Sequence, residues 1–112
     1  MEKPLMITEF VTFALPKGMT REQLFENYRQ TAPKWRDNPD LIRKNYLYDA
    51  TGRLGGGVYL WKTIASAQRW HDEAWRKKVL ALYGSEPTVR YFETPIVVDN
   101  LAQQTYEEAA AA

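Results

Sequence analysis

The chain has no cysteine among its 112 residues. This absence excludes disulfide bonds, thiolate nucleophiles and metal centres held by cysteine sulfur. There is only one histidine, His71, and only two serines, Ser66 and Ser85. Neither serine lies in a nucleophile elbow or near a second histidine, so a Ser-His-acid triad has no support. Asp72 and Glu73 follow the histidine directly, but neighbours on a helix diverge by about 100°, so no metal site is predicted.

The chain also has little net charge and no long apolar run. Fifteen Lys and Arg residues against 14 Asp and Glu give a formal charge of +1, so no global field would attract nucleic acid or an acidic membrane surface. No apolar run approaches the roughly 18 residues that span a bilayer, and the N-terminus lacks a signal-peptide pattern. We expect one cytoplasmic domain that binds neither nucleic acid nor membrane.

Four segments have the composition of strands. Residues 4–15, 41–49 and 57–62 are rich in β-branched and aromatic residues, and turn residues bound them. Residues 87–100 supply a last strand, interrupted by Pro95, which belongs at an edge or a bulge. The short loop of residues 50–56 between the second and third strands predicts an antiparallel hairpin.

Two segments have the pattern of helices. In residues 20–35, Thr20 and Gln23 form a weak capping box, and a stripe on one face contains Leu24, Tyr28, Thr31 and Trp35. Pro33 is expected to kink or end this helix near its last turn. The second helix is expected to begin after Thr63 or Ser66 and to run to about Trp75, with further turns before Gly84.

The order strand, helix, strand, strand, helix, strand is the split βαβ arrangement of ferredoxin-like domains. We therefore predict an α+β fold, a four-stranded antiparallel sheet with two helices on one face. The domain is expected to cover residues 1–100. Residues 101–112 are expected to form a C-terminal tail, helical or arm-like, with partly disordered final alanines.

The first strand is apolar on both of its faces. Side chains alternate across a strand, so one face carries Leu5, Ile7, Val11, Phe13 and Leu15, and the other carries Met6, Phe10 and Ala14. Two helices cover only one face of such a sheet, and an exposed apolar face needs a second cover. The sequence therefore predicts a homodimer in which two sheets pack face to face.

Three consecutive glycines, Gly55, Gly56 and Gly57, raise the question of a phosphate-binding loop. Such loops follow a strand and open a helix, whereas these glycines precede a strand. We interpret them as part of a hairpin loop with positive backbone angles, and as a strand start where another backbone or a ligand comes close.

His71 lies near the middle of the apolar stripe of the second helix, so it should point toward the sheet. One interpretation is a core histidine satisfied by a backbone carbonyl or a tyrosine hydroxyl. The other is a general base or hydrogen-bond donor in a small cavity between helix and sheet.

Aromatic residues make up 13% of the chain, which fits either an ordinary core or a pocket for a flat organic molecule. The candidate wall residues are Tyr28, Trp35, Tyr59, Trp61, Trp70 and Trp75. The polar residues within predicted strands are candidates for orienting a ligand, although each is also typical of a solvent-facing or interface charge: Glu9, Arg43, Asn45, Arg90 and Glu93.

Several motifs resemble the YdhR family of monooxygenases, within the dimeric α/β-barrel superfamily. They are P-x-L-I-x-K-x-Y in the second strand, GG-V-Y-L-W in the third, S-A-x-x-W in the second helix, and YG-x-x-P-x-V-x-Y-F-x-x-P-I-V-V-D-N at the end. The resemblance covers about residues 5–100. Asp40 stands where the family often has glycine, and His71 has no fixed counterpart in the family pattern.

The resemblance implies a ferredoxin-like subunit whose sheet packs on that of its partner, with a cavity between helices and sheet. Related members include oxygenases that use no metal, flavin or haem, so no cofactor is expected. Their substrates are quinols or polycyclic phenols, which reduce oxygen themselves once deprotonated in a dry pocket. The resemblance places Trp61 and Trp70 as walls, Tyr59 as a hydrogen bonder and His71 as the base.

The leading hypothesis is a cofactor-independent monooxygenase that acts on a small hydroxylated aromatic or quinol. Two alternatives remain open on the same fold: a non-catalytic ligand-binding or stress-associated dimer, and an isomerase or cyclase that uses His71 without oxygen.

Overall fold

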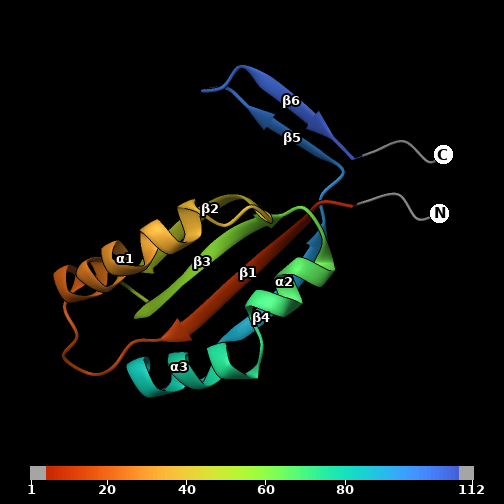
Figure 1. The fold of residues 1–112 in the computed structure, drawn as a ribbon. Coiled ribbons are helices and arrows are strands. Elements are labelled where there is room, and N and C mark those ends of the chain that lie inside the picture. Colours follow the sequence, from red (N-terminus) through yellow and green to blue (C-terminus); the bar gives the residue numbers. More distant parts are fainter. Residues whose placement is uncertain (1–4, 109–112) are drawn as a thin grey trace.

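A four-stranded antiparallel sheet forms the centre of the protein, in a computed structural model that describes residues 5–108. Its strands are β1 (Ile7–Ala14), β2 (Leu41–Asp49), β3 (Leu54–Trp61) and β4 (Thr88–Glu93), in the order β2-β3-β1-β4. Helices α1 (Arg21–Arg36), α2 (Ile64–Trp70) and α3 (Glu73–Tyr83) lie on one face of this sheet (Figure 1). The predicted α+β fold is confirmed, and the strand order is that of a ferredoxin-like sheet.

Helix α1 begins as its sequence predicts. The Thr20 hydroxyl accepts a hydrogen bond from the Gln23 backbone N–H, and the Gln23 side chain accepts one from the Thr20 N–H, which completes the capping box. Leu24 and Trp35, at the two ends of the predicted stripe, are buried. Pro33 lies inside the helix, which ends one turn later at Arg36.

The second predicted helix is in fact two helices. Helix α2 ends at Trp70, and α3 begins at Glu73. His71 has a non-helical backbone, and the Asp72 side chain accepts a hydrogen bond from the Trp75 N–H. Asp72 therefore caps a new helix and competes with continuation of the first one. Within residues 5–108, no helix is both long and apolar enough to cross a membrane.

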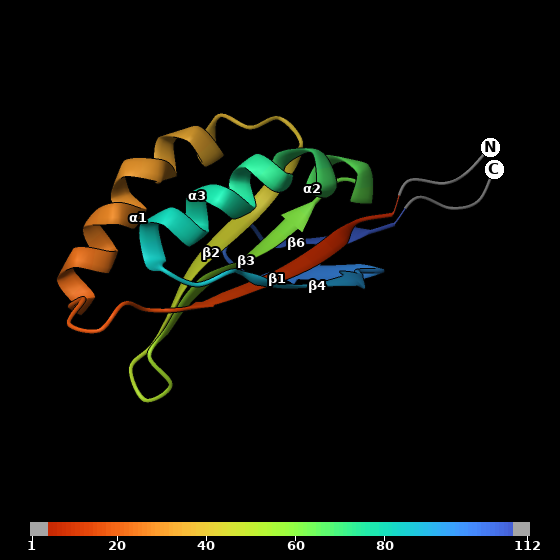
Figure 2. The same cartoon turned by 90° about the horizontal axis from the view of Figure 1, so that it is seen from below.

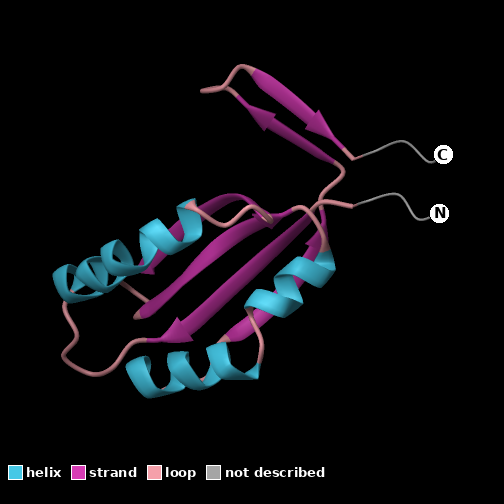
Figure 3. Cartoon of the chain, in the orientation of Figure 1, coloured by secondary structure: helices cyan, strands magenta, loops and turns pink. Residues whose placement is uncertain are grey.

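The expectation of one last strand interrupted by Pro95 was wrong. Strand β4 belongs to the main sheet, whereas β5 (Ile96–Asp99) pairs with β6 (Gln104–Glu107) in a separate two-stranded sheet. Figure 3 shows this hairpin projecting away from the main sheet. The expected tail thus contains strand β6, while the final alanines from residue 109 onward lie outside the described residues.

The two faces of the main sheet differ as the alternation on β1 predicts. Ile7, Val11 and Phe13 are buried under the helices, whereas Phe10 and Ala14 point to the other face and are exposed. Figure 2 shows all three helices on one side of the sheet. The opposite face of the main sheet carries no helix among the described residues.

The consecutive glycines lie within β3, so the expectation that they belong to the hairpin loop before the strand was wrong. Gly56 has a φ of 153°, and a Cβ added there would lie 1.9 Å from the Val11 carbonyl oxygen. The predicted close approach is therefore present at Gly56, since only glycine fits that position.

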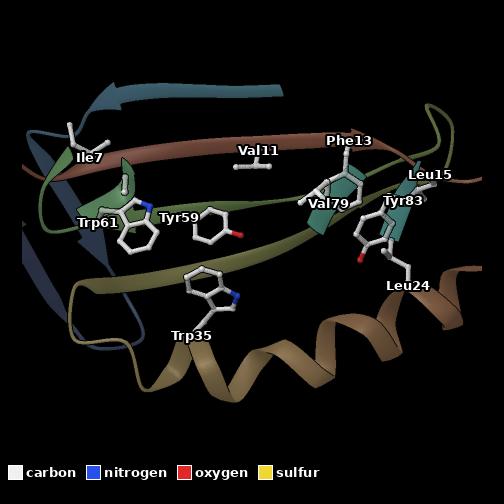
Figure 4. Close-up of a cluster of buried hydrophobic side chains, with 11 residues drawn as sticks. Ile7, Val11, Phe13, Leu15, Leu24, Trp35, Tyr59, Trp61, Val79 and Tyr83 are labelled. Carbon is white, nitrogen blue, oxygen red and sulfur yellow. The ribbon is translucent and has the colours of Figure 1, made fainter. Parts of the chain in front are cut away.

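The core lies between the helices and β1 and β3 (Figure 4). Trp35 reaches from α1 toward Tyr59 and Trp61 of β3, with its ring centroid 5.4 Å and 6.0 Å from theirs. Phe13 stacks on Tyr83 of α3 at 4.1 Å. The aromatic residues therefore form two clusters that hold the helices to the sheet.

Candidate functional site

A cavity of about 240 Å³ lies between α1, α3 and the sheet. The rings in its wall come from Tyr28, Trp35, Tyr46, Tyr59 and Trp75, among others. It resembles a small-molecule site in that apolar and aromatic side chains dominate the wall and polar groups are few.

Four of the six predicted wall residues line this cavity, namely Tyr28, Trp35, Tyr59 and Trp75. The other two lie outside it. Trp61 is fully buried in the core. Trp70 donates a hydrogen bond from Nε1 to Asp40 at 3.3 Å. Hydrogen bonds from Trp70 and Arg69 lower the pKa of this exposed carboxyl group.

The Tyr28 hydroxyl is committed to the protein backbone. It donates to the Leu47 carbonyl at 2.8 Å and accepts from the Gly56 N–H at 2.9 Å. Leu47 and Gly56 face each other on β2 and β3, so the hydroxyl bridges two strands. Burial raises the pKa of Tyr28 to about 12, and the residue contributes its ring to the cavity.

A buried polar cluster connects the sheet to the α2–α3 junction. Oε1 of Glu9 lies 2.9 Å from Nε1 of Trp61 and 2.6 Å from Nδ1 of His71. Glu9 and His71 both have fully buried side chains. Oε2 of Glu9 and Nε2 of His71 are also buried and have no hydrogen-bond partner. A buried carboxyl group is costly without hydrogen-bond partners, so Trp61 and His71 are the contacts that stabilise Glu9 in the core.

His71 points inward, as its helical stripe predicts, but it does not line the cavity. Its ring stacks on Trp75 at 3.9 Å and meets Tyr59 edge-on at 4.5 Å. Burial lowers the pKa of His71, although the hydrogen bond to Glu9 acts in the opposite direction. His71 is thus a largely neutral side chain that contacts Tyr59 and Trp75, two residues of the cavity wall, from the side away from the cavity.

Lys44 of β2 lines the cavity together with Lys34 and Lys78, and it is the lysine whose amine lies among the aromatic rings of the sheet. Its Nζ lies 3.8 Å from the ring centroid of Tyr46, 4.4 Å from that of Tyr59 and 4.7 Å from that of Trp35. Burial, and then the positive charge of Lys34, lower the pKa of Lys44 to about 7. The ring faces favour the ammonium form, so both protonation states are accessible near neutral pH.

A single row of side chains crosses the sheet at this level. Tyr91, Glu9, Tyr59 and Lys44 are register partners on β4, β1, β3 and β2. Burial and the charge of Glu9 raise the pKa of Tyr91 to about 12. Burial also raises the pKa of Tyr59 well above its usual value. The acid and the base are therefore separated by the ring of Tyr59.

The sequence signal for Lys44 is its position relative to the aromatic residues of β2. Lys44, Tyr46 and Tyr48 alternate onto one face, the helix-covered face. The candidates Arg43 and Asn45 lie on the opposite face, where Nε of Arg43 donates to Oδ1 of Asn45 at 3.2 Å.

The remaining polar candidates from the sequence are Arg90, Glu93 and Glu9, and only one of them lies under the helices. Arg90 pairs with Phe10 on the uncovered face, and Glu93 is exposed at the end of β4. Glu9 is the one member of the candidate polar set that is buried under the helices. Across residues 5–108, no group of three or more His, Asp or Glu side chains is placed to hold a metal ion.

Comparison with known proteins adds no family. No protein-family model matches the chain. No curated protein matches it either. The structure by itself supports an α+β fold with a four-stranded antiparallel sheet, and the resemblance to the YdhR family stays a prediction.

Proposed function

We propose that the protein is a cofactor-independent monooxygenase that acts on a small hydroxylated aromatic compound or quinol bound in the cavity described above. The observation that carries the proposal is the cavity itself, a space of about 240 Å³ walled by aromatic rings and reached by an ionisable amine. The YdhR-like motifs support the same activity.

The volume limits the size of the ligand. A cavity of about 150 Å³ accepts benzene, and drug-sized ligands occupy roughly 300–1,000 Å³. A cavity of about 240 Å³ therefore suits a ligand of one or two rings, in the absence of wall movement.

The chemistry needs no metal or flavin if the ligand is electron-rich enough to reduce oxygen. For the simplest quinol, the balanced reaction is C₆H₄(OH)₂ + O₂ → C₆H₄O₃ + H₂O, in which one oxygen atom enters the ring and the product is a hydroxyquinone. Removal of a proton from the quinol allows electron transfer to O₂, a carbon–oxygen bond forms at the ring, and loss of water leaves the hydroxyquinone. The protein would orient the ligand between rings, exclude bulk water and accept the proton.

In this proposal, His71 positions the wall through Trp75 and Tyr59. Its Nε2 atom lies buried without a partner, and the ring is separated from the cavity by these two residues. Service as the base would require displacement of Trp75. His71→Ala tests both roles, since a positioning role raises KM and a base role lowers kcat without a large change in KM.

Oxygen uptake with a panel of one-ring and two-ring quinols tests the activity. Uptake is expected with the unsubstituted protein and should fall by tenfold or more in Trp75→Leu, which removes a wall. Trp70→Leu, a matched substitution outside the cavity, should retain uptake. Binding of panel members with no uptake would refute the oxygenase and favour the non-catalytic alternative. Turnover without oxygen would favour an isomerase or cyclase.

We also propose that a second copy of the chain covers the bare face of the sheet. Phe10 of β1 and Phe92 of β4 are diagonal neighbours there, since Phe10 pairs with Arg90 and Thr8 pairs with Phe92. The two rings are 37% and 42% exposed, and adjacent exposed rings on an uncovered sheet face are typical of an interface. A monomeric mass in solution at micromolar concentration would refute the homodimer.

A further inference from the structure

We propose that Lys44 is the counterion of the ligand, and that the cavity binds an acidic phenol as its phenolate. This inference rests on the proposed function in one respect, since both place the ligand in the same cavity. It adds the charge state of the ligand and the residue that sets it.

The first argument is the isolation of the Lys44 amine. Within residues 5–108, the side-chain amine of Lys44 forms no hydrogen bond and no ion pair, and its backbone belongs to the β2–β3 ladder. Its contacts are the faces of Trp35, Tyr46 and Tyr59. Ring faces attract a cation but do not use its three N–H donors as an oxygen anion would. A partly buried ammonium is normally paired, so this one lacks an acceptor.

The second argument is the sign of the charge around the cavity. Lys34 and Lys78 also line it, and none of the described lining residues is Asp or Glu. The nearby acid is Glu9, but its Oε1 atom already faces Trp61 and His71. Its register partner Tyr59 stands between it and Lys44. The cavity therefore presents positive charge to its contents without an internal carboxylate to balance it.

The third argument is that two of the neighbouring hydroxyls are already used. The Tyr28 hydroxyl bridges Leu47 and Gly56, and the Tyr46 hydroxyl is hydrogen-bonded to Thr31. Lys44 thus supplies the cationic group at this level of the wall that can meet a polar atom of the ligand. The flat rings around it select a ligand whose anion is attached to an aromatic ring.

A phenol fits better than an aromatic carboxylate because it can enter uncharged. A carboxylate would have to lose its hydration before it met Lys44, whereas a neutral phenol enters the apolar cavity at little cost. Once inside, it transfers its proton to the neutral Lys44 amine: ArOH + Lys–NH₂ → ArO⁻ + Lys–NH₃⁺. No redox step is involved, and the product is an ion pair in a poorly hydrated space, where attraction is strong.

The test uses 4-nitrophenol, whose phenol and phenolate forms have different absorption spectra. Spectra of the bound probe are recorded over a range of pH under nitrogen, so that the result does not depend on oxygen chemistry. With the unsubstituted protein, the ionisation midpoint of the bound probe should fall by about one pH unit or more, which corresponds to a tenfold preference for phenolate.

Three variants make the assignment specific. Lys44→Met should restore the midpoint of the free probe, and Lys44→Arg, which keeps the positive charge, should retain a lowered midpoint. Lys77→Met removes one exposed lysine of α3 outside the cavity wall and should behave as the unsubstituted protein does. Circular dichroism establishes that each variant is folded.

Three outcomes would overturn the inference. The first is a lowered midpoint that survives in Lys44→Met, and the second is failure of 4-nitrophenol to bind. The third is displacement of the probe by 4-nitrobenzoate at a lower concentration than other phenols need to displace it, which would identify a carboxylate site. Phenolate binding together with an absence of oxygen uptake would refute the monooxygenase alone.

Discussion

Replacement of Glu9 by leucine removes the acceptor at the centre of the buried polar cluster. Oε1 of Glu9 faces both Nε1 of Trp61 and Nδ1 of His71, so Glu9→Leu leaves two buried nitrogen atoms without a partner. Each unpaired group costs about 1–3 kcal/mol, so the two nitrogen atoms together cost about 2–6 kcal/mol. A domain of this size is stable by only about 5–15 kcal/mol, so a loss of about 2–6 kcal/mol is a large fraction of its stability.

Comparison with Glu9→Gln separates the effect of losing the hydrogen-bond acceptor from the effect of replacing the side chain. The glutamine amide oxygen still accepts hydrogen bonds in the same place, so glutamine should destabilise the protein less than leucine does. The free energy of unfolding is measured by urea titration with tryptophan fluorescence. The urea midpoints are compared at a common dependence of the unfolding free energy on urea concentration. Glu93→Leu, at an exposed acid on β4, is the control and should change stability by no more than about 0.5 kcal/mol.

The result that would refute this reasoning is a loss below about 1 kcal/mol in Glu9→Leu, or equal losses in the leucine and glutamine variants. Acid adds a second check. Because burial lowers the pKa of His71 from 6.5, the unfolded chain binds a proton more readily than the folded chain. Stability from this group is therefore present above about pH 6.5 and is lost as the pH falls toward the folded-state pKa. His71→Phe should flatten that loss.

Three further substitutions have calculable effects. Because the pKa of Lys44 falls from 10.5 to about 7 on folding, the unfolded chain binds more protons between these values. The free energy of unfolding should rise by on the order of 2 kcal/mol from pH 7 to pH 9, and Lys44→Met should abolish that rise in urea titrations. Gly56→Ala places a Cβ 1.9 Å from the Val11 carbonyl oxygen. Gly18→Ala also meets a positive φ, 85°, but its added Cβ has nothing within 4 Å, so the thermal midpoint should fall more in Gly56→Ala than in Gly18→Ala. Tyr28→Phe leaves the Leu47 carbonyl and the Gly56 N–H unbridged and should cost about 1–3 kcal/mol by urea titration, whereas Tyr48→Phe should be near neutral.

The parts of the fold that follow from alternation and capping could be predicted. Period-two patterning identified the buried face of β1, and the Thr20–Gln23 pair marked the start of α1. The break between α2 and α3 was missed because an apolar stripe at helical spacing continues across it. The local cause is the Asp72 side chain, which caps a new helix. The spacing of apolar residues does not mark the end of a helix at this position.

The aromatic residues of the cavity wall could be predicted from the sequence, but the lysine that lies among these rings could not. Four aromatic wall residues were identified because large side chains on the covered face must pack near one another. Lys44 was missed because a lysine on a strand is normally solvated, and its burial depends on the bulk of three rings from two other elements and its own strand. The separation of His71 from the cavity depends on the turn at residues 71–72, which no periodicity specifies.

The order of residues in the row Tyr91, Glu9, Tyr59 and Lys44 accounts for the absence of an ion pair between Glu9 and Lys44. Neighbouring strands lie about 4.8 Å apart, so the backbones of Glu9 and Lys44, two strands apart, are separated by roughly twice that distance, with Tyr59 between them. Each charge therefore finds its partner elsewhere: Glu9 contacts Trp61 and His71 in the core, and Lys44 faces the cavity. Had Tyr59 been a small residue, the two long side chains could approach each other and neutralise internally. The ring of Tyr59 lies against the Lys44 amine instead, and under our proposal the partner of this amine is an anion that comes from outside.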